Sequence, residues 1–263
     1  MTIQKIDVTE RYNFKRIIQT QEQQIGFVVA TNLKTTFIHS GNATLEIMEE
    51  NGQLEKIALS EGEGFVITPG VEYKLNASEQ FTAYEVSSEV KNGEPIIEII
   101  DTEDKKEEVP LPKYKIIKDP KKVVKPWGHE LWIMWTKDYH VMKQIGMNAG
   151  NRSSLQFHRE KLETNYLQEG EADVIDGYRL NPQASEEEVQ ESSIGINFDD
   201  FKNRQTPGTH WTSIPGTVHR VIAVTDYLAY EVSTPELDDV IRLQDDSGRN
   251  SGRIISEHIK YNK

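Results

Sequence analysis

Most of the chain alternates hydrophobic and polar residues in short runs. Examples are "TFIHSGNATLEIM", "GFVITPGVEYKL", "HVMKQIGM", "NYLQEGEADVI" and "YLAYEVS", and Gly, Pro or polar residues separate these runs. A period of two is typical of strands that bury one face, and glycine and proline between strands favour tight turns. The pattern therefore predicts an all-β protein.

The alternating pattern contains an internal repeat. "GEGFVITPGVEY" (Gly62 to Tyr73) and "GTHWTSIPGTVH" (Gly208 to His219) keep the same Gly and Pro-Gly spacing, and an identical "AYEVS" follows each. The interval of 146 residues between Tyr73 and His219 is the same for the other matched positions. Such self-similarity predicts two copies of one β unit.

The two copies meet in a stretch of charge runs and prolines, "EIIDTEDKKEEVPLPKYKIIKDPKKVVKP". We place the domain boundary near Pro110, which gives domains 1–110, with the linker, and 111–263. The second copy also carries an insertion, "DGYRLNPQASEEEVQESSIGINFDDFKNRQTPG", in which Ser185 to Ser192 predicts a short acidic helix. The insertion is either a solvated loop on the rim or a lid over a pocket.

Composition narrows the classes of function. The 263 residues carry a formal net charge of −13, which argues against binding nucleic acid or an anionic membrane by bulk electrostatics. Without cysteine, any transition metal must take nitrogen and oxygen ligands. The chain has no signal-peptide pattern and no apolar run long enough to span a bilayer, so we expect a soluble, cytoplasmic protein. Exposed strand edges leave room for a homodimer.

One short stretch of the second copy concentrates potential metal ligands. "SLQFHREKLE" (Ser154 to Glu163) contains Gln156, His158 and Glu163. A helix would separate Gln156 and His158 by about 200°, whereas a strand points both to one side, where they could bind one ion. A solvated hairpin would explain the same three polar residues.

Two motifs of the second copy resemble the cupin family. The spacing from Gly150 through Gln156, His158 and Glu163 to Gly170 resembles the first cupin motif, with Gln156 in place of the family's first histidine. The stretch from Gly208 to His219 resembles the second. In addition, "KPWGHE", "SLQFH", "IPGTVHR" and "DDVIRLQDDSGR" are similar, in this order, to the cupin domain of type II mannose-6-phosphate isomerases.

The resemblance implies two cupin barrels (double-stranded β-helix, jelly-roll) in tandem. It also implies one divalent transition metal, Zn, Fe, Mn or Ni, bound in the C-terminal barrel. We expect Gln156 and His158 to point inward from one strand, Glu163 from the strand paired with it after the turn, and His219 from a distant strand. The implied ligands are Gln156, His158, Glu163 and His219.

Aligning the two copies predicts that the first barrel lacks a metal site. Alignment of Gly41 with Gly170 places non-ligating side chains at three of the ligand positions, and the repeated motif places another opposite His219. We therefore expect the N-terminal barrel to serve packing, subunit contact or covering of the other barrel. These side chains are Phe27, Val29, Lys34 and Tyr73.

The isomerase resemblance implies aldose–ketose interconversion of a small-molecule sugar phosphate through an enediol. Lys143 and Arg220 are candidates for catalytic residues and Lys161 for substrate binding, although strict alternation would point Arg220 away from the ligand side. Two histidines and a carboxylate would also suit a non-haem Fe(II) oxygenase. A third alternative is a non-catalytic sugar-binding or scaffolding bicupin.

Overall fold

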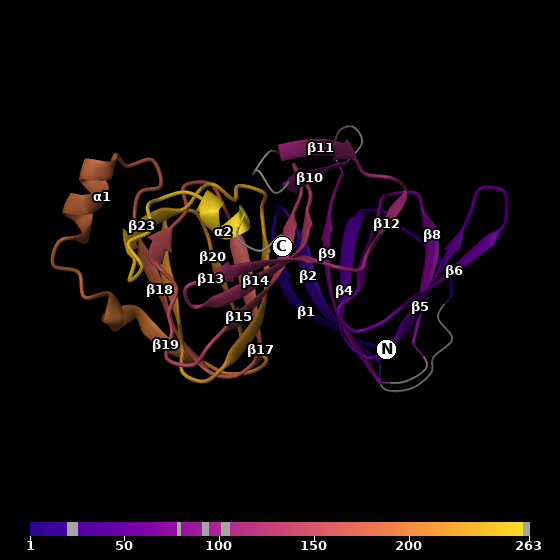
Figure 1. The fold of residues 1–263 in the computed structure, drawn as a ribbon, viewed down its shortest axis with the longest axis horizontal. Coiled ribbons are helices and arrows are strands. Elements are labelled where there is room, and N and C mark those ends of the chain that lie inside the picture. Colours follow the sequence, from indigo (N-terminus) through magenta and orange to yellow (C-terminus); the bar gives the residue numbers. More distant parts are fainter. Residues whose placement is uncertain (20–25, 78–79, 91–94, 101–105, 260–263) are drawn as a thin grey trace. The chain divides into compact units, whose positions relative to one another are not determined.

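The computed structural model describes residues 1–19, 26–77, 80–90, 95–100 and 106–259 (Figure 1). Almost all regular structure is β, as the alternating pattern predicts. The chain forms two compact units. Unit 1 comprises Met1–Ile100, Lys106–Lys121 and Trp132–Met142, and unit 2 includes Lys122–Leu131 and Lys143–Lys263. The domain boundary near Pro110 stays a prediction.

Unit 1 consists of two antiparallel sheets. The larger has the strand order β1-β2-β9-β4-β7-β12, and the smaller has the order β3-β8-β5-β6. The stretch expected as a linker contains a further hairpin of β10 and β11, whose register pairs Ile96 with Pro110. The strands are β1 (Thr2–Val8), β2 (Asn13–Gln19), β3 (Val28–Val29), β4 (Leu33–Ser40), β5 (Ala43–Met48), β6 (Leu54–Leu59), β7 (Gly64–Ile67), β8 (Glu72–Asn76), β9 (Phe81–Ser88), β10 (Ile96–Ile100), β11 (Lys106–Pro110) and β12 (Tyr114–Ile117).

Strands β13 to β23 also form two sheets. The first has the order β13-β14-β15-β22-β17-β20, and the second has the order β19-β18-β21-β16-β23. Two helices and one 3-10 turn accompany them. The elements are β13 (Lys121–Lys125), β14 (Gly128–Trp135), β15 (Val141–Met147), β16 (Leu155–Phe157), β17 (Glu163–Glu169), β18 (Ala172–Arg179), α1 (Glu186–Ser193), η1 (Phe198–Phe201), β19 (Lys202–Gln205), β20 (His210–Ser213), β21 (Thr217–Ala223), β22 (Tyr227–Ser233), β23 (Ile241–Gln244) and α2 (Ile255–Ile259).

The two strand orders confirm the internal repeat. The order β2-β9-β4-β7 of unit 1 corresponds to β15-β22-β17-β20, and β3-β8-β5-β6 corresponds to β16-β21-β18-β19. The repeated motif ends on equivalent strands, since Tyr73 lies on β8 and His219 on β21. The same sequence pattern thus folds twice into one strand arrangement.

Unit 2 buries two separate apolar clusters. The cluster between the sheets combines Leu167 and Ala229 from one sheet with Val174 and Ala223 from the other. The second cluster lies on the outer face of the five-stranded sheet, where Phe157 contributes to it. Successive side chains of a strand point to opposite faces of the sheet. The residues that alternate with those of the outer cluster therefore point into the space between the two sheets.

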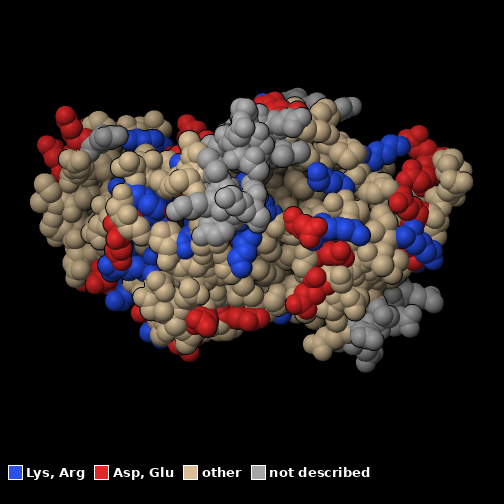
Figure 2. Space-filling model, viewed as in Figure 1, with Lys and Arg blue, Asp and Glu red and all other residues tan. Residues whose placement is uncertain are grey.

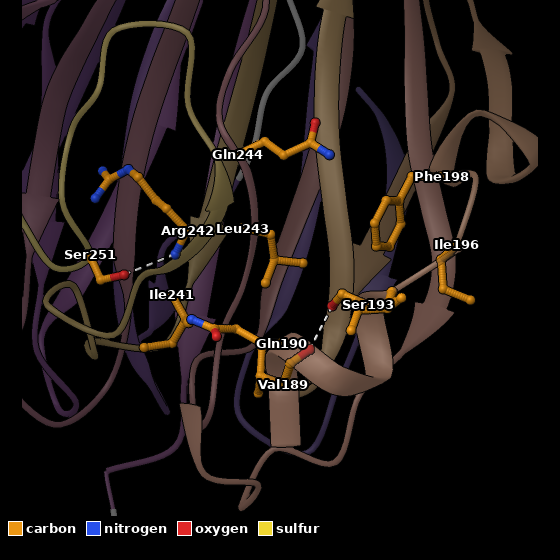
Figure 3. A pocket seen from close by; sticks show the side chains of 11 residues that line it. Val189, Gln190, Ser193, Ile196, Phe198, Ile241, Arg242, Leu243, Gln244 and Ser251 are labelled. Carbon is orange, nitrogen blue, oxygen red and sulfur yellow. Dashed lines mark hydrogen bonds between the residues drawn. The ribbon is translucent and has the colours of Figure 1, made fainter. Parts of the chain in front are cut away.

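The predicted helix in the insertion is confirmed as α1. Ser185 caps it: its hydroxyl accepts the Glu188 backbone N–H, and the Glu188 carboxylate accepts the N–H of Ser185. Val189 of α1 belongs to the outer cluster, so this helix packs on the outer face of the sheet. A pocket of about 360 Å³ lies between α1 and β23 (Figure 3). The helix thus lines a pocket on the outer face, and its role as a rim loop or as a lid stays a prediction.

Charge is distributed over the surface in both signs. Acidic and basic side chains are interspersed on the face drawn in Figure 2. No helix in the described part of the chain is long and apolar enough to cross a membrane.

Candidate metal centre

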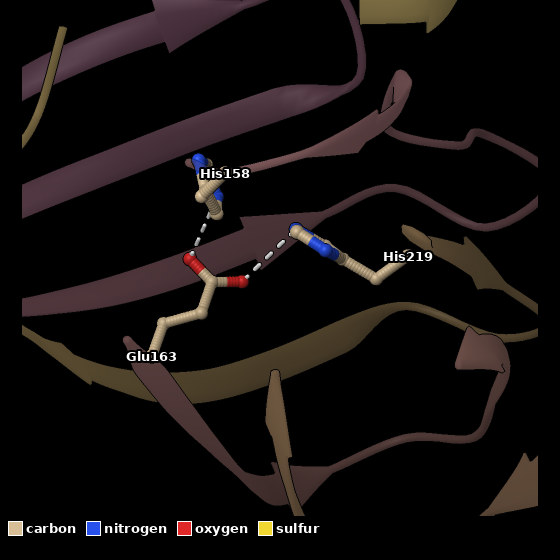
Figure 4. A group of neighbouring side chains, drawn as sticks. All are labelled: His158, Glu163 and His219. Atoms are coloured by element: carbon tan, nitrogen blue, oxygen red, sulfur yellow. Dashed lines mark ion pairs between the residues drawn. The ribbon is translucent and has the colours of Figure 1, made fainter. Parts of the chain in front are cut away.

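Three side chains of unit 2 converge in the interior. His158, Glu163 and His219 each present a ligand atom, and these atoms lie within 4.8 Å of one another (Figure 4). The three residues are only 2%, 4% and 6% exposed. Within the described ranges, no other group of three histidine, aspartate or glutamate side chains meets in this way. The structure therefore brings together three of the four predicted ligands.

The ligands come from two different sheets. Gln156 on β16 lies directly opposite His219 on β21, and His158 follows the end of β16. Glu163 is the first residue of β17, which pairs with β20 and β22 in the other sheet. The expectation that Glu163 lies on the strand paired with β16 was wrong, because the turn after His158 carries the chain from one sheet to the other. The carboxylate therefore faces the two imidazoles across the interior.

The ring nitrogens of both histidines are oriented by backbone carbonyl groups. His219 Nδ1 donates to the Thr217 carbonyl at 2.9 Å, which directs Nε2 at Glu163 Oε1, 3.2 Å away. His158 Nδ1 donates to the Asp239 carbonyl, and its Nε2 lies 3.4 Å from Glu163 Oε2. A second hydrogen bond of this kind fixes the tautomer of a metal-binding histidine.

The buried Nε2 of His158 has no hydrogen-bond partner among the described residues. With both Nδ1 atoms donating, the two Nε2 atoms and the carboxylate face one another, and one cation between them would satisfy all three groups. Nitrogen and oxygen donors of this kind suit a divalent transition metal. The three side chains therefore fit the expected ion.

The three groups shift one another's pKa values. Burial would raise the pKa of Glu163, but Lys161 and the two imidazoles hold it well below its usual range. Burial lowers the pKa of His158. For His219, burial works in the same direction, yet the Glu163 carboxylate raises its pKa. Glu163 is therefore ionised and available as a ligand at neutral pH.

Gln156 is in position but turned partly away from the group. Its Oε1 accepts a hydrogen bond from Ser154 Oγ at 2.6 Å, and its Nε2 lies 3.4 Å from His219 Nε2. The amide oxygen thus has a protein partner other than a metal. A ligand role for Gln156 stays a prediction.

The structure shows one supporting residue that the sequence did not suggest. The Asp239 carboxylate accepts the backbone N–H groups of Arg159, Glu160 and Lys161 at 3.0, 2.6 and 3.0 Å. Its carbonyl oxygen also accepts His158 Nδ1. One residue therefore fixes the turn and orients the ligand that begins it. Nothing in "ELDDVIR" marks this role, because the contact spans 81 residues.

Lys161, predicted to bind substrate, lies against the metal group. Its Nζ is 2.5 Å from Glu163 Oε2 and 3.1 Å from Glu231 Oε1. Lys143 contacts the same Glu231 from another side: its Nζ lies 3.6 Å from Glu231 Oε1 and 3.5 Å from Glu130 Oε2. Carboxylates and ammonium groups thus alternate from Glu163 outward, and both predicted lysines belong to this chain of charges.

Arg220 lies on the outer face of its sheet. Its Nε donates to the Ser153 carbonyl at 2.9 Å, and its Nη2 donates to the Gln244 carbonyl at 3.2 Å. Its strand partner is Ile175, a member of the outer cluster. Because neighbouring side chains of a strand point to opposite faces, Arg220 points away from the side on which His219 lies. The catalytic role of Arg220 stays a prediction, and these contacts do not support it.

The corresponding position of unit 1 carries different chemistry. Lys34 Nζ donates to the Tyr73 hydroxyl at 3.1 Å and lies 3.9 Å from Glu85 Oε1. Phe27 contacts Lys74, whose Nζ is 5.4 Å from its ring centroid, and Val29 is 58% exposed. An ammonium and a phenol thus stand where unit 2 has a carboxylate and an imidazole.

The fold and the group together define a protein of two similar antiparallel β units in tandem, with a set of side chains suited to a divalent metal in the second. No protein-family model matches the chain. No curated protein sequence matches it either.

Solved structures of oxalate decarboxylases share the fold. The *Bacillus subtilis* enzyme, described with Mn(II) centres, superposes with a TM-score of 0.61 at 11% identity, covering 89% of this chain and 72% of that one. The *Lactobacillus farciminis* enzyme in a formate complex gives 0.61 at 12% identity, covering 89% and 80%. At these identities the likeness shows the fold alone. The comparisons do not support the closer resemblance to mannose-6-phosphate isomerases.

Proposed function

We propose that the protein is a metal-dependent aldose–ketose isomerase acting on a small sugar phosphate in unit 2. The observation that carries the proposal is the convergence of His158, Glu163 and His219 beside the ion pair of Lys161 and Glu231. Isomerisation needs a positive centre near two adjacent oxygen atoms and groups that exchange protons with the substrate. A metal held by these three side chains would supply the positive centre, whereas the group that exchanges protons is not assigned.

A bound divalent ion would polarise the carbonyl and the neighbouring hydroxyl group of the sugar. His158, Glu163 and His219 would hold it, with Gln156 as the predicted fourth ligand. Manganese is the first ion to test, because the Bacillus subtilis oxalate decarboxylase, which shares the fold, is described with Mn(II) centres.

The protein's own charges would orient the substrate. Lys161 and Lys143 flank Glu231, so their ammonium groups can donate to substrate oxygen atoms on the same side. Glu231 itself has an equivalent in unit 1, where Lys15 lies 2.8 Å from Glu85. A pair present in both units favours a structural role for Glu231, and we assign no base.

The test is turnover of hexose and pentose phosphates, beginning with mannose 6-phosphate, by protein loaded with Mn(II), Zn(II), Fe(II) or Ni(II). We expect interconversion of aldose and ketose that His219→Ala abolishes and Tyr73→Phe in unit 1 retains. Metal-loaded wild-type protein that converts no sugar phosphate would refute the isomerase. Stabilisation by a sugar without turnover would instead indicate a binding module.

The position of Gln156 favours a second candidate function. The amide oxygen of Gln156 accepts a hydrogen bond from Ser154. The candidate metal centre then offers two histidines and one carboxylate, which is the ligand set of non-haem Fe(II) oxygenases. Oxygen consumption that requires Fe(II) and the His158 side chain would support this alternative over isomerisation.

A further inference from the structure

Lys161 is a buried cation in direct contact with a candidate metal ligand. It is 5% exposed, and its Nζ lies 2.5 Å from Glu163 Oε2 and 3.1 Å from Glu231 Oε1. The backbone N–H of Lys161 donates a hydrogen bond to the Asp239 carboxylate, which fixes the position of Lys161 in the turn. The ammonium therefore neutralises a carboxylate that would otherwise be buried with uncompensated charge.

The other carboxylate in contact with Lys161 is itself shared. Glu231 Oε1 lies between Lys161 and Lys143, at 3.1 and 3.6 Å. Lys143 also contacts Glu130 Oε2 at 3.5 Å. Glu231 is thus held in place independently of Lys161 and offers Lys161 a partner other than Glu163.

In unit 1 the counterpart of Glu231 also pairs with lysines, although the position of Lys161 itself is taken by Asn32. Glu85, the counterpart of Glu231, lies 2.8 Å from Lys15 Nζ and 3.9 Å from Lys34 Nζ. Lys34 occupies the sequence position of Glu163 itself. Lysine therefore pairs with this carboxylate in both units, and only in unit 2 does one of these lysines, Lys161, also contact a candidate ligand.

We propose that Lys161 is the internal counter-ion of the metal centre and sets its affinity. In the metal-free protein the ammonium neutralises Glu163. A divalent ion must compete with it for that charge, while Glu231 keeps Lys161 in place. The centre consequently binds its ion more weakly than its three ligands alone would allow. This inference rests on the metal centre of the proposed function, and it is independent of the reaction.

Metal affinity is the quantity that tests the proposal. Purified metal-free protein is titrated with Mn(II) or Zn(II) alone against an absorbing chelator, and circular dichroism checks that each variant is folded. Lys161→Met removes the positive charge and keeps the unbranched side chain. We expect it to bind both ions about tenfold more tightly or more, because a unit charge a few ångströms from the ion no longer opposes it. Lys161→Arg, which keeps the charge, is expected to bind close to the wild-type affinity.

A second variant changes affinity in the opposite direction. Glu231→Gln leaves Lys161 with Glu163 as its charged partner, so both ions should bind several-fold more weakly. The matched control is Lys125→Met. Lys125 also lies between two carboxylates, Glu130 at 3.6 Å and Glu257 at 2.9 Å, but neither of them is a candidate ligand. Its replacement should change affinity less than either test variant.

Unchanged or weaker binding by folded Lys161→Met overturns the proposal, as does unchanged or tighter binding by Glu231→Gln. The second variant decides the matter if the first does not fold. Wild-type protein that binds neither ion would overturn the metal centre together with this inference. Opposite shifts in the two variants without any sugar-phosphate turnover would support Lys161 as the counter-ion and refute the isomerase alone.

Discussion

Replacing Asp239 with asparagine removes one negative charge from the turn that positions His158 and Lys161. The carboxylate accepts three backbone N–H groups, two of them on Oδ2 and one on Oδ1. An asparagine amide has one oxygen and one NH₂ group. Whichever way it turns, at least one backbone N–H loses its acceptor and the remaining bonds lose their charge assistance.

The structure sets the size of the effect. Hydrogen bonds to ionised groups are about twice as strong as neutral ones, and a lost partner costs about 1–3 kcal/mol when buried. The turn is partly exposed, so water replaces some of this loss. We expect the Asp239→Asn substitution to lower the free energy of unfolding by about 1–2 kcal/mol. Because the turn begins at His158, metal affinity should fall by about 10–100-fold, the usual cost of disturbing the partner of a ligand.

Urea denaturation and metal titration measure the two effects. The control is the neighbouring Asp238→Asn, whose side chain is 55% exposed and lies 2.9 Å from Arg253 Nε. Surface pairs of this kind contribute little, so the control should resemble wild type in both assays. Wild-type metal affinity in folded Asp239→Asn would show that the turn does not need this carboxylate, and the reasoning would fail.

The pH dependence provides an independent check on Asp239. Burial would raise its pKa, but three backbone N–H groups and His158 lower it in the folded protein. Its stabilisation is therefore present above the unfolded pKa of about 3.9 and is lost as the pH falls through the lower folded value. The difference in stability between wild type and Asp239→Asn should be constant near neutral pH and shrink below about pH 4.

Three further predictions concern the metal and the fold. His158→Ala and His219→Ala should each reduce the bound metal from about one ion per chain to nearly none by mass spectrometry, and retention of the ion by both would exclude this centre. Gly170→Ala should destabilise the protein by about 3 kcal/mol or more in urea, because its φ is +83° and a Cβ would lie 1.9 Å from the Asp226 carbonyl oxygen; Gly150→Ala, at φ +78° in open space, should cost only about 1 kcal/mol. Burial lowers the pKa of His140 to about 3 in the folded protein. Below the unfolded pKa of about 6.5 the unfolded chain therefore takes up a proton that the folded protein does not. The free energy of unfolding should consequently fall by about 1.4 kcal/mol for each pH unit below about 6.5. Thermal unfolding from pH 7 to 4 should therefore show a steeper decline for wild type than for His140→Asn, and parallel curves would contradict it.

Local sequence patterns determined the strands, the repeat and the types of ligand. Alternation has a period of two whichever partner a strand finds, so β4, β15 and β22 could be recognised before any pairing was known. The repeat identified two units because both copies keep their glycines and prolines at the same turns. Capping by Ser185 is equally local, and α1 was predicted to within one residue.

Tertiary structure decided how the ligands meet. Which sheet receives Glu163 depends on how the turn after His158 crosses the interior, and a spacing of five residues is compatible with either a paired or a facing strand. The contacts of His158 with Asp239 and of Lys161 with Glu231 span 81 and 70 residues. Such contacts depend on packing between distant strands, which no local pattern encodes. The sequence therefore supplied the ligands, and the packing of the two sheets supplied the counter-ion and the residue that orients them.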